Sequence, residues 1–208
     1  MEAENQATLD SGNETLVLRV GYDGTSYAGF AQQEKQPHVK TVAGELRQAL
    51  RTVLRHDVEL TCAGRTDAGV HARAQYVSLP FGAEEFEQRT SQRLLRSLGA
   101  VLPPDIRVYE LYRAPSGFSA RFDARARRYR YHLCSGPVGP LFCANWSWWI
   151  RTAQPHALDA NAMNEAARCL IGEHDFKSFC KAQSAIDKPT CRYVMSAFFE
   201  PEVVLGEE

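Results

Sequence analysis

Residues 58–79, VELTCAGRTDAGVHARAQYVSL, consist of two short segments with alternating apolar residues and a glycine-containing loop between them. The alternation runs over 58–62 and again near 73–79, and a period of two is typical of strands that bury one face. The loop AGRTDAGVHA, at 63–72, contains two glycines, which allow a sharp turn and a close backbone approach. The sequence therefore predicts two strands joined by a loop.

A helix and a further strand are predicted on each side of this pair. Upstream, LVLRVGY at 16–22 alternates as a strand, and Thr41 can cap a helix over 42–55. Downstream, a second helix fits 84–98, and IRVYELY at 106–112 is predicted as a fourth strand. The order β-α-β-β-α-β predicts an α+β fold of the ferredoxin-like type, with an antiparallel sheet and both helices on one face.

A second half of the chain is expected to begin after the loop at 114–126. Strands are predicted at 127–134, 146–151 and 191–199, and a helix at 159–171. If this half repeats the first, it is incomplete, because a helix and at least one strand are missing from it.

These patterns divide the chain into three parts. Residues 1–15 are predicted to be a disordered acidic tail, 16–113 the N-terminal ferredoxin-like half, and 114–208 a truncated C-terminal half. The segment GEHDFKSF, at 172–179, is expected to be a helix end and turn. The aromatic side chains expected in the core of the second half are Trp146, Trp148 and Trp149.

The distribution of charge permits an RNA partner, although the net charge is only −1. All 24 Lys and Arg residues lie between Arg19 and Arg192, a region that holds 17 of the 25 acidic residues. Nineteen of these 24 bases are Arg, the side chain suited to bidentate phosphate contacts.

Several other classes of protein are disfavoured by the sequence. No run of about 18 apolar residues, the length of a membrane-spanning helix, occurs, and the polar N-terminus is unlike a secretory signal. The six cysteines form no CxxC pair and the six histidines show no HxxxH or HExxH spacing, which predicts neither a metal site nor a disulfide framework. A reducing cytoplasm is therefore the expected location.

The loop at 63–72 holds the residues best suited to chemistry. Asp67 offers a carboxylate, and Arg65 can orient or screen it, reach a phosphate, or fill the gap left by an extruded base. The alternative is a tight turn in which Arg65 and Asp67 form a surface ion pair, since Asp is a common turn residue. His71 is expected to pack or hydrogen-bond near the loop, without a catalytic role.

The second candidate segment is FSARFDARARRYRYHL, at 118–133, which interleaves arginines with tyrosines. On a strand, Tyr129 and Tyr131 would share one face while Arg128 and Arg130 share the other. One face could then stack on a base while the other meets phosphates. The alternative is a basic exposed strand with its tyrosines in the core.

Five segments occur together in one order: GYDGTSYAGF, AGRTDAGVHA, LPPDIRVY, FSARFDARARRYRYHL and GEHDFKSF. In this the chain resembles the tRNA pseudouridine synthase A family, from about Leu16 to Arg192. The resemblance implies two ferredoxin-like halves around a central cleft, in a homodimer that binds tRNA. It also implies conversion of uridine to pseudouridine on the three-prime side of the anticodon stem-loop, without a metal or organic cofactor.

The resemblance implies roles for individual residues. Asp67 matches the essential aspartate of the family, Arg65 the arginine that holds the base-flipped state, and Tyr129 the tyrosine that packs against the target base. The sequence leaves open whether Asp67 acts as a nucleophile at C1′ or as a base at the C2′ proton. Further basic residues expected to contact tRNA are Arg121, Arg127 and Arg128.

The chain also departs from the family pattern. Phe30-Ala31 stands where Trp-Gln is usual, Ala43 where Gln is usual, and Gly99 where an Asn is usual. The family continues beyond this C-terminus with a strand, a Met-Val-Arg helix whose arginine pairs with the catalytic aspartate, and a final strand. We therefore expect a truncated or degenerate chain, and two rival functions stay open: an RNA-binding module without turnover, and a ferredoxin-like protein-interaction domain.

Overall fold

Strand β1, Asn13–Tyr22, lies inside a four-stranded sheet in the computed structural model, which describes residues 13–32, 38–155, 157–180 and 189–202. The contacts within the chain divide it into two compact units, Met1–Tyr129 (unit 1) and Arg130–Glu208 (unit 2). In unit 1, β1 pairs antiparallel with β3, Ala72–Gly82, and with β4, Ile106–Ala114.

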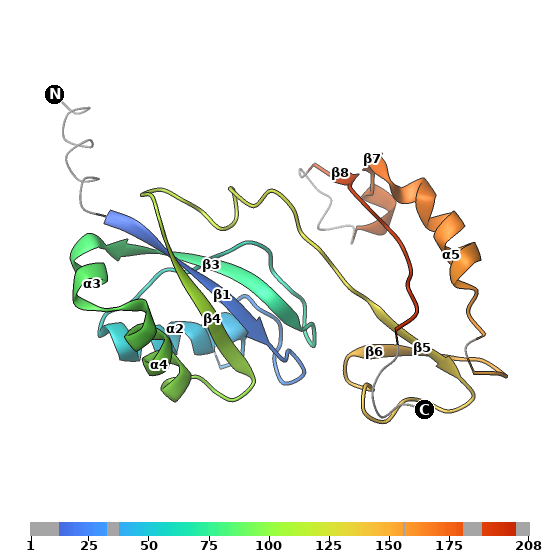
Figure 1. The fold of residues 1–208 in the computed structure, drawn as a ribbon, viewed down its shortest axis with the longest axis horizontal. Helices are drawn as coiled ribbons and strands as arrows, with labels where there is room; N and C mark the ends of the chain where they lie inside the picture. The colour runs from blue at the N-terminus through green and yellow to red at the C-terminus, as the bar shows by residue number, and fades with distance from the viewer. Residues whose placement is uncertain (1–12, 33–37, 156, 181–188, 203–208) are drawn as a thin grey trace. The chain divides into compact units, whose positions relative to one another are not determined.

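The fourth strand of this sheet is short. Strand β2, Thr61–Cys62, pairs antiparallel with the middle of β3 at the sheet edge, and the order is β2-β3-β1-β4. Figure 1 shows β3, β1 and β4 of this sheet. The predicted strand at 58–62 is therefore reduced to its last two residues, because Val58 is buried in the core without pairing. The α+β class and the antiparallel sheet are confirmed for unit 1.

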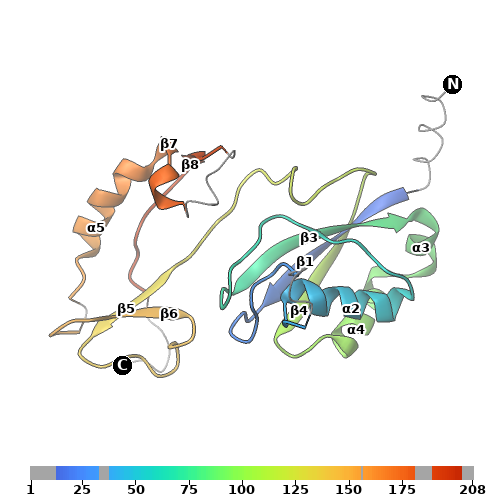
Figure 2. The same ribbon diagram turned by 180° about the vertical axis from the view of Figure 1, so that it is seen from behind.

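Two helices cover one face of this sheet (Figure 2). Helix α2, Val42–Leu54, begins after Thr41, whose side chain accepts a hydrogen bond from the Gly44 amide. Its buried stripe recurs at the spacing of a helix with one apolar face. That stripe consists of Val42, Ala43, Leu46, Ala49, Leu50 and Leu54.

The second predicted helix, at 84–98, is two helices in the structure. Helix α3 spans Ala83–Gln88 and is followed by its C-cap residue, Arg89. Helix α4, Ser91–Val101, begins after Thr90. The break has a local cause, because the Thr90 hydroxyl accepts from the Arg93 amide as an N-cap. The extended backbone of Arg89 also lets its guanidinium donate to the Val53 carbonyl at 3.0 Å.

The core lies between these helices and the sheet. Leu16, Leu18 and Val20 alternate along β1 toward Leu46 of α2 and Leu98 of α4, and all are essentially inaccessible to solvent. Burial of a leucine side chain of this kind contributes about 1.5–3 kcal/mol, so the alternation seen in the sequence accounts for much of the stability of unit 1.

The segment after β4 folds back over unit 1. The buried Ala120 amide donates to the Ser78 hydroxyl of β3 at 3.0 Å, and Arg127 donates to the Ala63 carbonyl. Residues 114–129, which the sequence pattern assigns to the second half, therefore make their contacts with the first.

Unit 2 contains two separate strand pairs. Strands β5, His132–Gly136, and β6, Ser147–Arg151, pair in parallel, which differs from the antiparallel sheet expected there. Parallel pairing needs a connection that returns to the start of the sheet, and here it is the ten-residue loop 137–146. Because β5 begins at His132, the strand predicted from residue 127 is wrong over its first five residues.

Helix α5, Ala160–Ala167, follows the Asp159 cap, and a 3-10 turn, η1, extends it over Arg168–Leu170. Strand β7, Gly172–Asp175, then pairs antiparallel with β8, Cys191–Val194 (Figure 1). Residues 172–175 are thus a strand rather than the predicted helix end. A short 3-10 turn, η2, follows at Lys177–Phe179.

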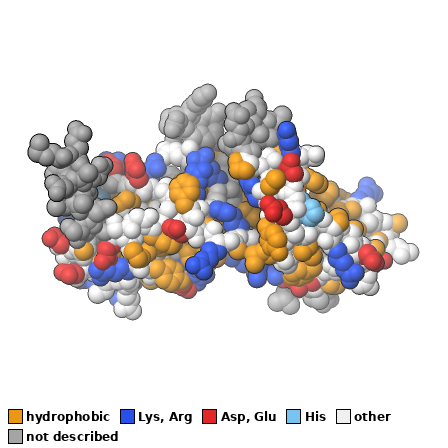
Figure 3. Space-filling model, turned by 90° about the horizontal axis from the view of Figure 1, so that it is seen from above, with side chains coloured by type: hydrophobic (Ala, Val, Ile, Leu, Met, Phe, Trp, Pro, Cys, Tyr) orange, Lys and Arg blue, Asp and Glu red, His pale blue; other side chains and the backbone are white. Residues whose placement is uncertain are grey.

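The tryptophans of unit 2 are not in a core, contrary to expectation. Trp148 is 58% exposed, and Trp146 and Trp149 are each 38% exposed. Trp146 packs edge-on against His132, with ring centroids 4.9 Å apart. Hydrophobic side chains are also visible at the surface in Figure 3.

Candidate functional site

The loop between β2 and β3 presents Arg65 and Asp67, both with exposed side chains. The Asp67 carboxylate makes no hydrogen bond or ion pair with any residue that the structure describes, and in particular no pair with Arg65. The surface ion pair considered as an alternative is therefore absent. The side chain of Asp67 is available to a ligand.

The backbone next to Asp67 is held by the loop at 21–30. The Thr66 carbonyl accepts from the Phe30 amide at 3.0 Å, and the Gly69 amide donates to the Tyr27 carbonyl at 3.3 Å. The Thr66 hydroxyl lies 2.8 Å from the Tyr22 phenol oxygen. The residue before Asp67 is thus fixed through both its carbonyl and its side chain.

Two glycines allow this close contact. Gly29 has φ of +112°, and a Cβ there would lie 2.8 Å from the Thr66 carbonyl oxygen. A Cβ on Gly24 would lie 2.0 Å from the Val70 carbonyl oxygen. Side chains at either position would push the two loops apart.

Tyr22 is a buried support for the loop. Burial raises the pKa of its phenol, and the hydrogen bond with Thr66 partly offsets this. The phenol therefore stays neutral at physiological pH, and its contact with Thr66 persists there.

Arg127 ties the arginine-rich segment to the base of the loop. Its Nε donates to the Ala63 carbonyl at 3.0 Å, and its Nη2 donates to the same oxygen. Gly64 leaves room for this contact, because a Cβ there would lie 3.2 Å from the Arg127 Nε. Arg127, expected to contact tRNA, thus also has a structural partner inside unit 1.

The charges of Arg65 and Arg121 both act on Cys62 of β2. Burial raises the pKa of the Cys62 thiol, and the positive charges of Arg65 and Arg121 oppose that rise. Arg121 also lies over the Phe122 ring, 5.3 Å from its centroid. Two of the predicted site arginines are therefore close enough to β2 for their charges to act on Cys62.

Arg128 and Tyr129 are exposed, and Tyr129 retains 79% of its accessible surface. Neither side chain makes a hydrogen bond or ring contact with the described residues of the loop. The structure does not bring these two predicted residues onto Asp67. His71 packs near the loop as expected, with its Nδ1 3.2 Å from the Asp23 carboxylate.

Gln75 supports the loop and was not anticipated. It is buried in β3, and its side-chain nitrogen donates to the Gly64 carbonyl at 2.5 Å. A signal for it exists in the sequence, because alternation places this polar residue on the core face with Val77 and Leu79. A polar residue on a core face needs a hydrogen-bond partner.

Within the described ranges, no three His, Cys, Asp or Glu side chains gather as metal ligands would. No helix in that part of the chain is long and apolar enough to cross a membrane.

Comparison with known proteins identifies similar chains. The family profile described as tRNA pseudouridine synthase matches residues 19–123, from β1 through the Asp67 loop into the arginine-rich segment. tRNA pseudouridine synthase A of Streptomyces avermitilis is 46% identical over 169 residues, which cover 79% of this chain and 56% of that protein. Its counterpart in Corynebacterium glutamicum is 43% identical over 173 residues, with 81% and 58% covered.

tRNA pseudouridine synthase A of Caldicellulosiruptor bescii is 36% identical over 191 residues, which cover 91% of this chain and 73% of that protein. The chain spans little more than half the length of the relatives from Streptomyces avermitilis and Corynebacterium glutamicum.

Proposed function

Because the chain belongs to the tRNA pseudouridine synthase A family, we propose that it isomerises uridine to pseudouridine in tRNA, with Asp67 as the catalytic carboxylate. One observation carries the proposal: the Asp67 side chain is exposed and unpaired among the described residues, on a loop whose backbone is fixed at Thr66. An unpaired carboxylate has all its lone pairs available for a substrate.

The reaction requires one carboxylate at the sugar. The C1′–N1 bond breaks, the uracil turns, and a C1′–C5 bond forms; C5 loses its proton to solvent and N1 gains one, so the composition is unchanged. Asp67 acts either as a nucleophile at C1′, in a covalent intermediate, or as a base that removes the C2′ proton. No electrons are exchanged with a second reactant, so the isomerisation is redox-neutral.

The target nucleotide must leave its stack before Asp67 can reach the ribose, at a cost of a few kcal/mol. We assign Arg65 to the space that the extruded base vacates, since its guanidinium is exposed two residues from Asp67. Tyr129 is assigned to stacking on the uracil, which its exposure permits.

Phosphate contacts are assigned to Arg121, Arg127 and Arg128. Arg128 is exposed with no hydrogen-bond partner among the described residues, and Lys and Arg side chains are exposed on the face drawn in Figure 3. Guanidinium groups of this kind bind phosphate oxygens in bidentate fashion.

We further propose that unit 1 is a ferredoxin-like half, which its strand order β2-β3-β1-β4 supports. The remaining proposals rest on family membership alone. They are a second half across a cleft, a homodimer, action on the three-prime side of the anticodon stem-loop, and a cytoplasmic location.

Tritium release from tRNA labelled at uridine C5 tests the assignment of Asp67. The wild-type chain releases label, and Asp67→Asn releases it at least about 100-fold more slowly, with tRNA affinity retained. The matched control is Asp57→Asn, an exposed carboxylate 3.4 Å from Arg51, which keeps the wild-type rate. Release by Asp67→Asn at the wild-type rate overturns the assigned role.

The second candidate is an RNA-binding module without turnover. It is favoured by the positive charges of Arg65 and Arg121 near β2, which can bind phosphate without any chemical step. Salt-dependent tRNA binding without label release supports it. Replacing one phosphate-contacting residue, as in Arg128→Ala, lowers the salt slope by about 0.7–0.9. A wild-type affinity that does not change with salt removes both RNA-based candidates.

A further inference from the structure

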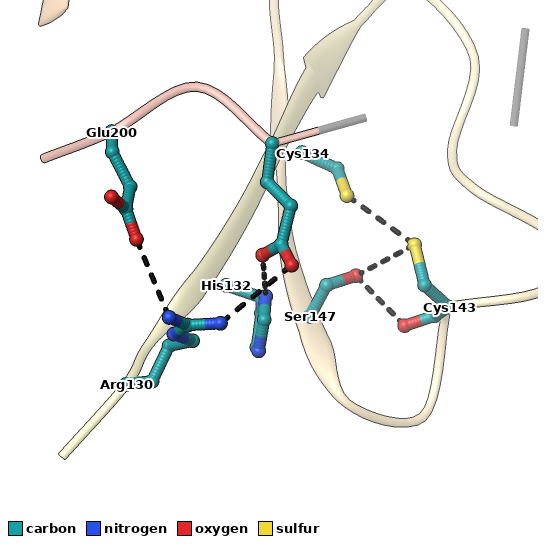
Figure 4. Close-up of polar contacts among 7 residues, drawn as sticks. Arg130, His132, Cys134, Cys143, Ser147 and Glu200 are labelled. Atoms are coloured by element: carbon teal, nitrogen blue, oxygen red, sulfur yellow. Dashed lines mark hydrogen bonds and ion pairs between the residues drawn. The ribbon is translucent and has the colours of Figure 1, made fainter. Parts of the chain in front are cut away.

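Two cysteines of unit 2 lie in contact, and the proposed reaction uses neither. The Sγ atoms of Cys134 and Cys143 are 3.4 Å apart (Figure 4), and no disulfide bond joins them in the structure. Cys134 lies in β5 and is partly exposed, whereas Cys143, in the loop before β6, is completely buried. A disulfide bond is about 2.05 Å long, so a shift of roughly 1.4 Å joins the two sulfur atoms.

The loop between the cysteines is shaped around Trp149. This residue is the register partner of Cys134 across the parallel pair, and its indole N–H donates to the Gly136 carbonyl at 3.1 Å. Gly139 lies against the ring, since a Cβ there would lie 3.2 Å from the Trp149 Cε3. The loop therefore wraps around the indole and returns Cys143 to β5.

Ser147 holds the far end of the loop. Its hydroxyl donates to the Cys143 carbonyl at 2.8 Å and lies 3.4 Å from the Cys143 Sγ (Figure 4). Among the described residues the two thiols do not belong to a group of three or more metal-ligating side chains. Two thiol sulfur atoms 3.4 Å apart are placed for thiol–disulfide chemistry.

We propose that Cys134 and Cys143 are a redox modification site that forms a reversible disulfide on reaction with a hydroperoxide. The more accessible sulfur, that of Cys134, attacks hydrogen peroxide. Its S–O bond forms as the O–O bond breaks, which yields a sulfenic acid and one water. The Cys143 sulfur then attacks the sulfenic sulfur, the S–S bond forms, and the hydroxyl leaves as a second water with the Cys143 proton.

Atoms and electrons balance in this reaction. Two thiols lose two electrons and become a disulfide, and one peroxide gains them and becomes two waters. The bond closes a ring over residues 134–143 and fastens the loop, with its exposed Val138, to β5. A thiol reductant reverses it by exchange.

The test is a thiol map of the 208-residue protein after treatment with hydrogen peroxide. Free thiols are alkylated in denaturant, the protein is digested with trypsin, and the masses are read. No Lys or Arg lies between Cys134 and Cys143, so both fall in the one tryptic peptide 131–151. We expect that peptide to carry no alkyl group and to weigh two hydrogens less than the same peptide with two unmodified thiols. Treatment with dithiothreitol before alkylation is expected to restore both thiols, so that both are then alkylated.

Matched variants identify the partners. Cys134→Ser and Cys143→Ser each abolish the change in this peptide, whereas Cys169→Ser, at an exposed cysteine, leaves it unchanged. The thiol map of the wild-type protein detects the disulfide without any variant, so a variant that fails to fold does not decide the result.

Two outcomes overturn the proposal. In the first, Cys134 and Cys143 are alkylated as free thiols at peroxide doses that oxidise the exposed cysteines 169, 180 and 191. In the second, the bond forms only in protein unfolded in urea, so that the native contact contributes nothing. Both readouts are independent of tRNA and of label release.

Discussion

Asp67 is positioned by the backbone of its neighbour rather than by contacts of its own side chain. Thr66 is bonded at its carbonyl by the Phe30 amide and at its hydroxyl by Tyr22. Gly29 makes this possible, because its φ of +112° and its missing Cβ let the two loops touch. The backbone at Thr66 thus fixes the position of Asp67, while no described side chain neutralises its carboxylate.

Gly29→Ala is therefore expected to damage the site. A non-glycine residue at positive φ costs about 1–2 kcal/mol, and the new Cβ would lie 2.8 Å from the Thr66 carbonyl oxygen. Urea unfolding should show a loss of about 1–3 kcal/mol, and any label release from tRNA should fall with it.

Gly99→Ala is the matched control. Gly99 lies in α4 with nothing within 4 Å of a built Cβ and without a positive φ. The same substitution should stabilise the protein there, by up to about 1 kcal/mol. Equal effects at the two glycines would show that close contact with Thr66 is not what Gly29 provides.

Helix α3 is held at its first turn by the side chain of Glu85. Glu85 accepts from the Gly82 amide at 3.3 Å, and its other oxygen lies 3.0 Å from the His56 Nε2. The His56 Nδ1 lies 3.1 Å from the Asp57 carbonyl. Both ring nitrogens donate only when the imidazole is protonated, so these contacts favour the charged form.

The pKa of His56 is raised, first by the Asp57 carbonyl and then by Glu85. We expect Glu85→Gln to lower this pKa in an NMR titration, since the amide cannot accept as a charged partner. The folded state binds the His56 proton more tightly than the unfolded state. Protonation of His56 therefore adds to the free energy of unfolding fully below the unfolded pKa of about 6.5, and this addition is lost as pH rises through the folded pKa.

The stability advantage of the wild type over Glu85→Gln should therefore be larger below about pH 6 than above about pH 8. The His56 side chain is 46% exposed, so solvent screening limits the difference to about 0.5 kcal/mol. An advantage that grows with pH would contradict the assignment.

At the scale of the molecule, the two units differ in how much apolar surface they bury. The main core cluster lies entirely between Leu16 and Ile106 of unit 1. Among the described residues of unit 2, only Gly136, Cys143 and Ala167 are buried. Local stability follows the density of buried contacts.

Hydrogen exchange should therefore be slowest in unit 1. Amides of β1, β3 and α2 are expected to exchange at least about tenfold more slowly than those of β5 to β8. Mass spectrometry of peptides from the intact chain measures this directly. Equal protection in β1 and β5 would mean that unit 2 is stabilised by something other than its described core.

Local patterns were enough to predict the regular elements of unit 1. Alternation predicted β1 and β4, and the apolar spacing after Thr41 predicted α2 to within one residue of its end. The break at Thr90 was missed, because the apolar pattern continues across it while the cap that decides it is a single hydroxyl.

The sequence by itself determined where the candidate residues lie, because a carboxylate between glycines and a row of arginines are local features. Only the tertiary structure decided how they are held. Arg127 reaches a carbonyl 64 residues away, and Tyr22 reaches a hydroxyl 44 residues away. Such contacts depend on where the folded chain returns, and periodicity, which describes only near neighbours, does not contain that information.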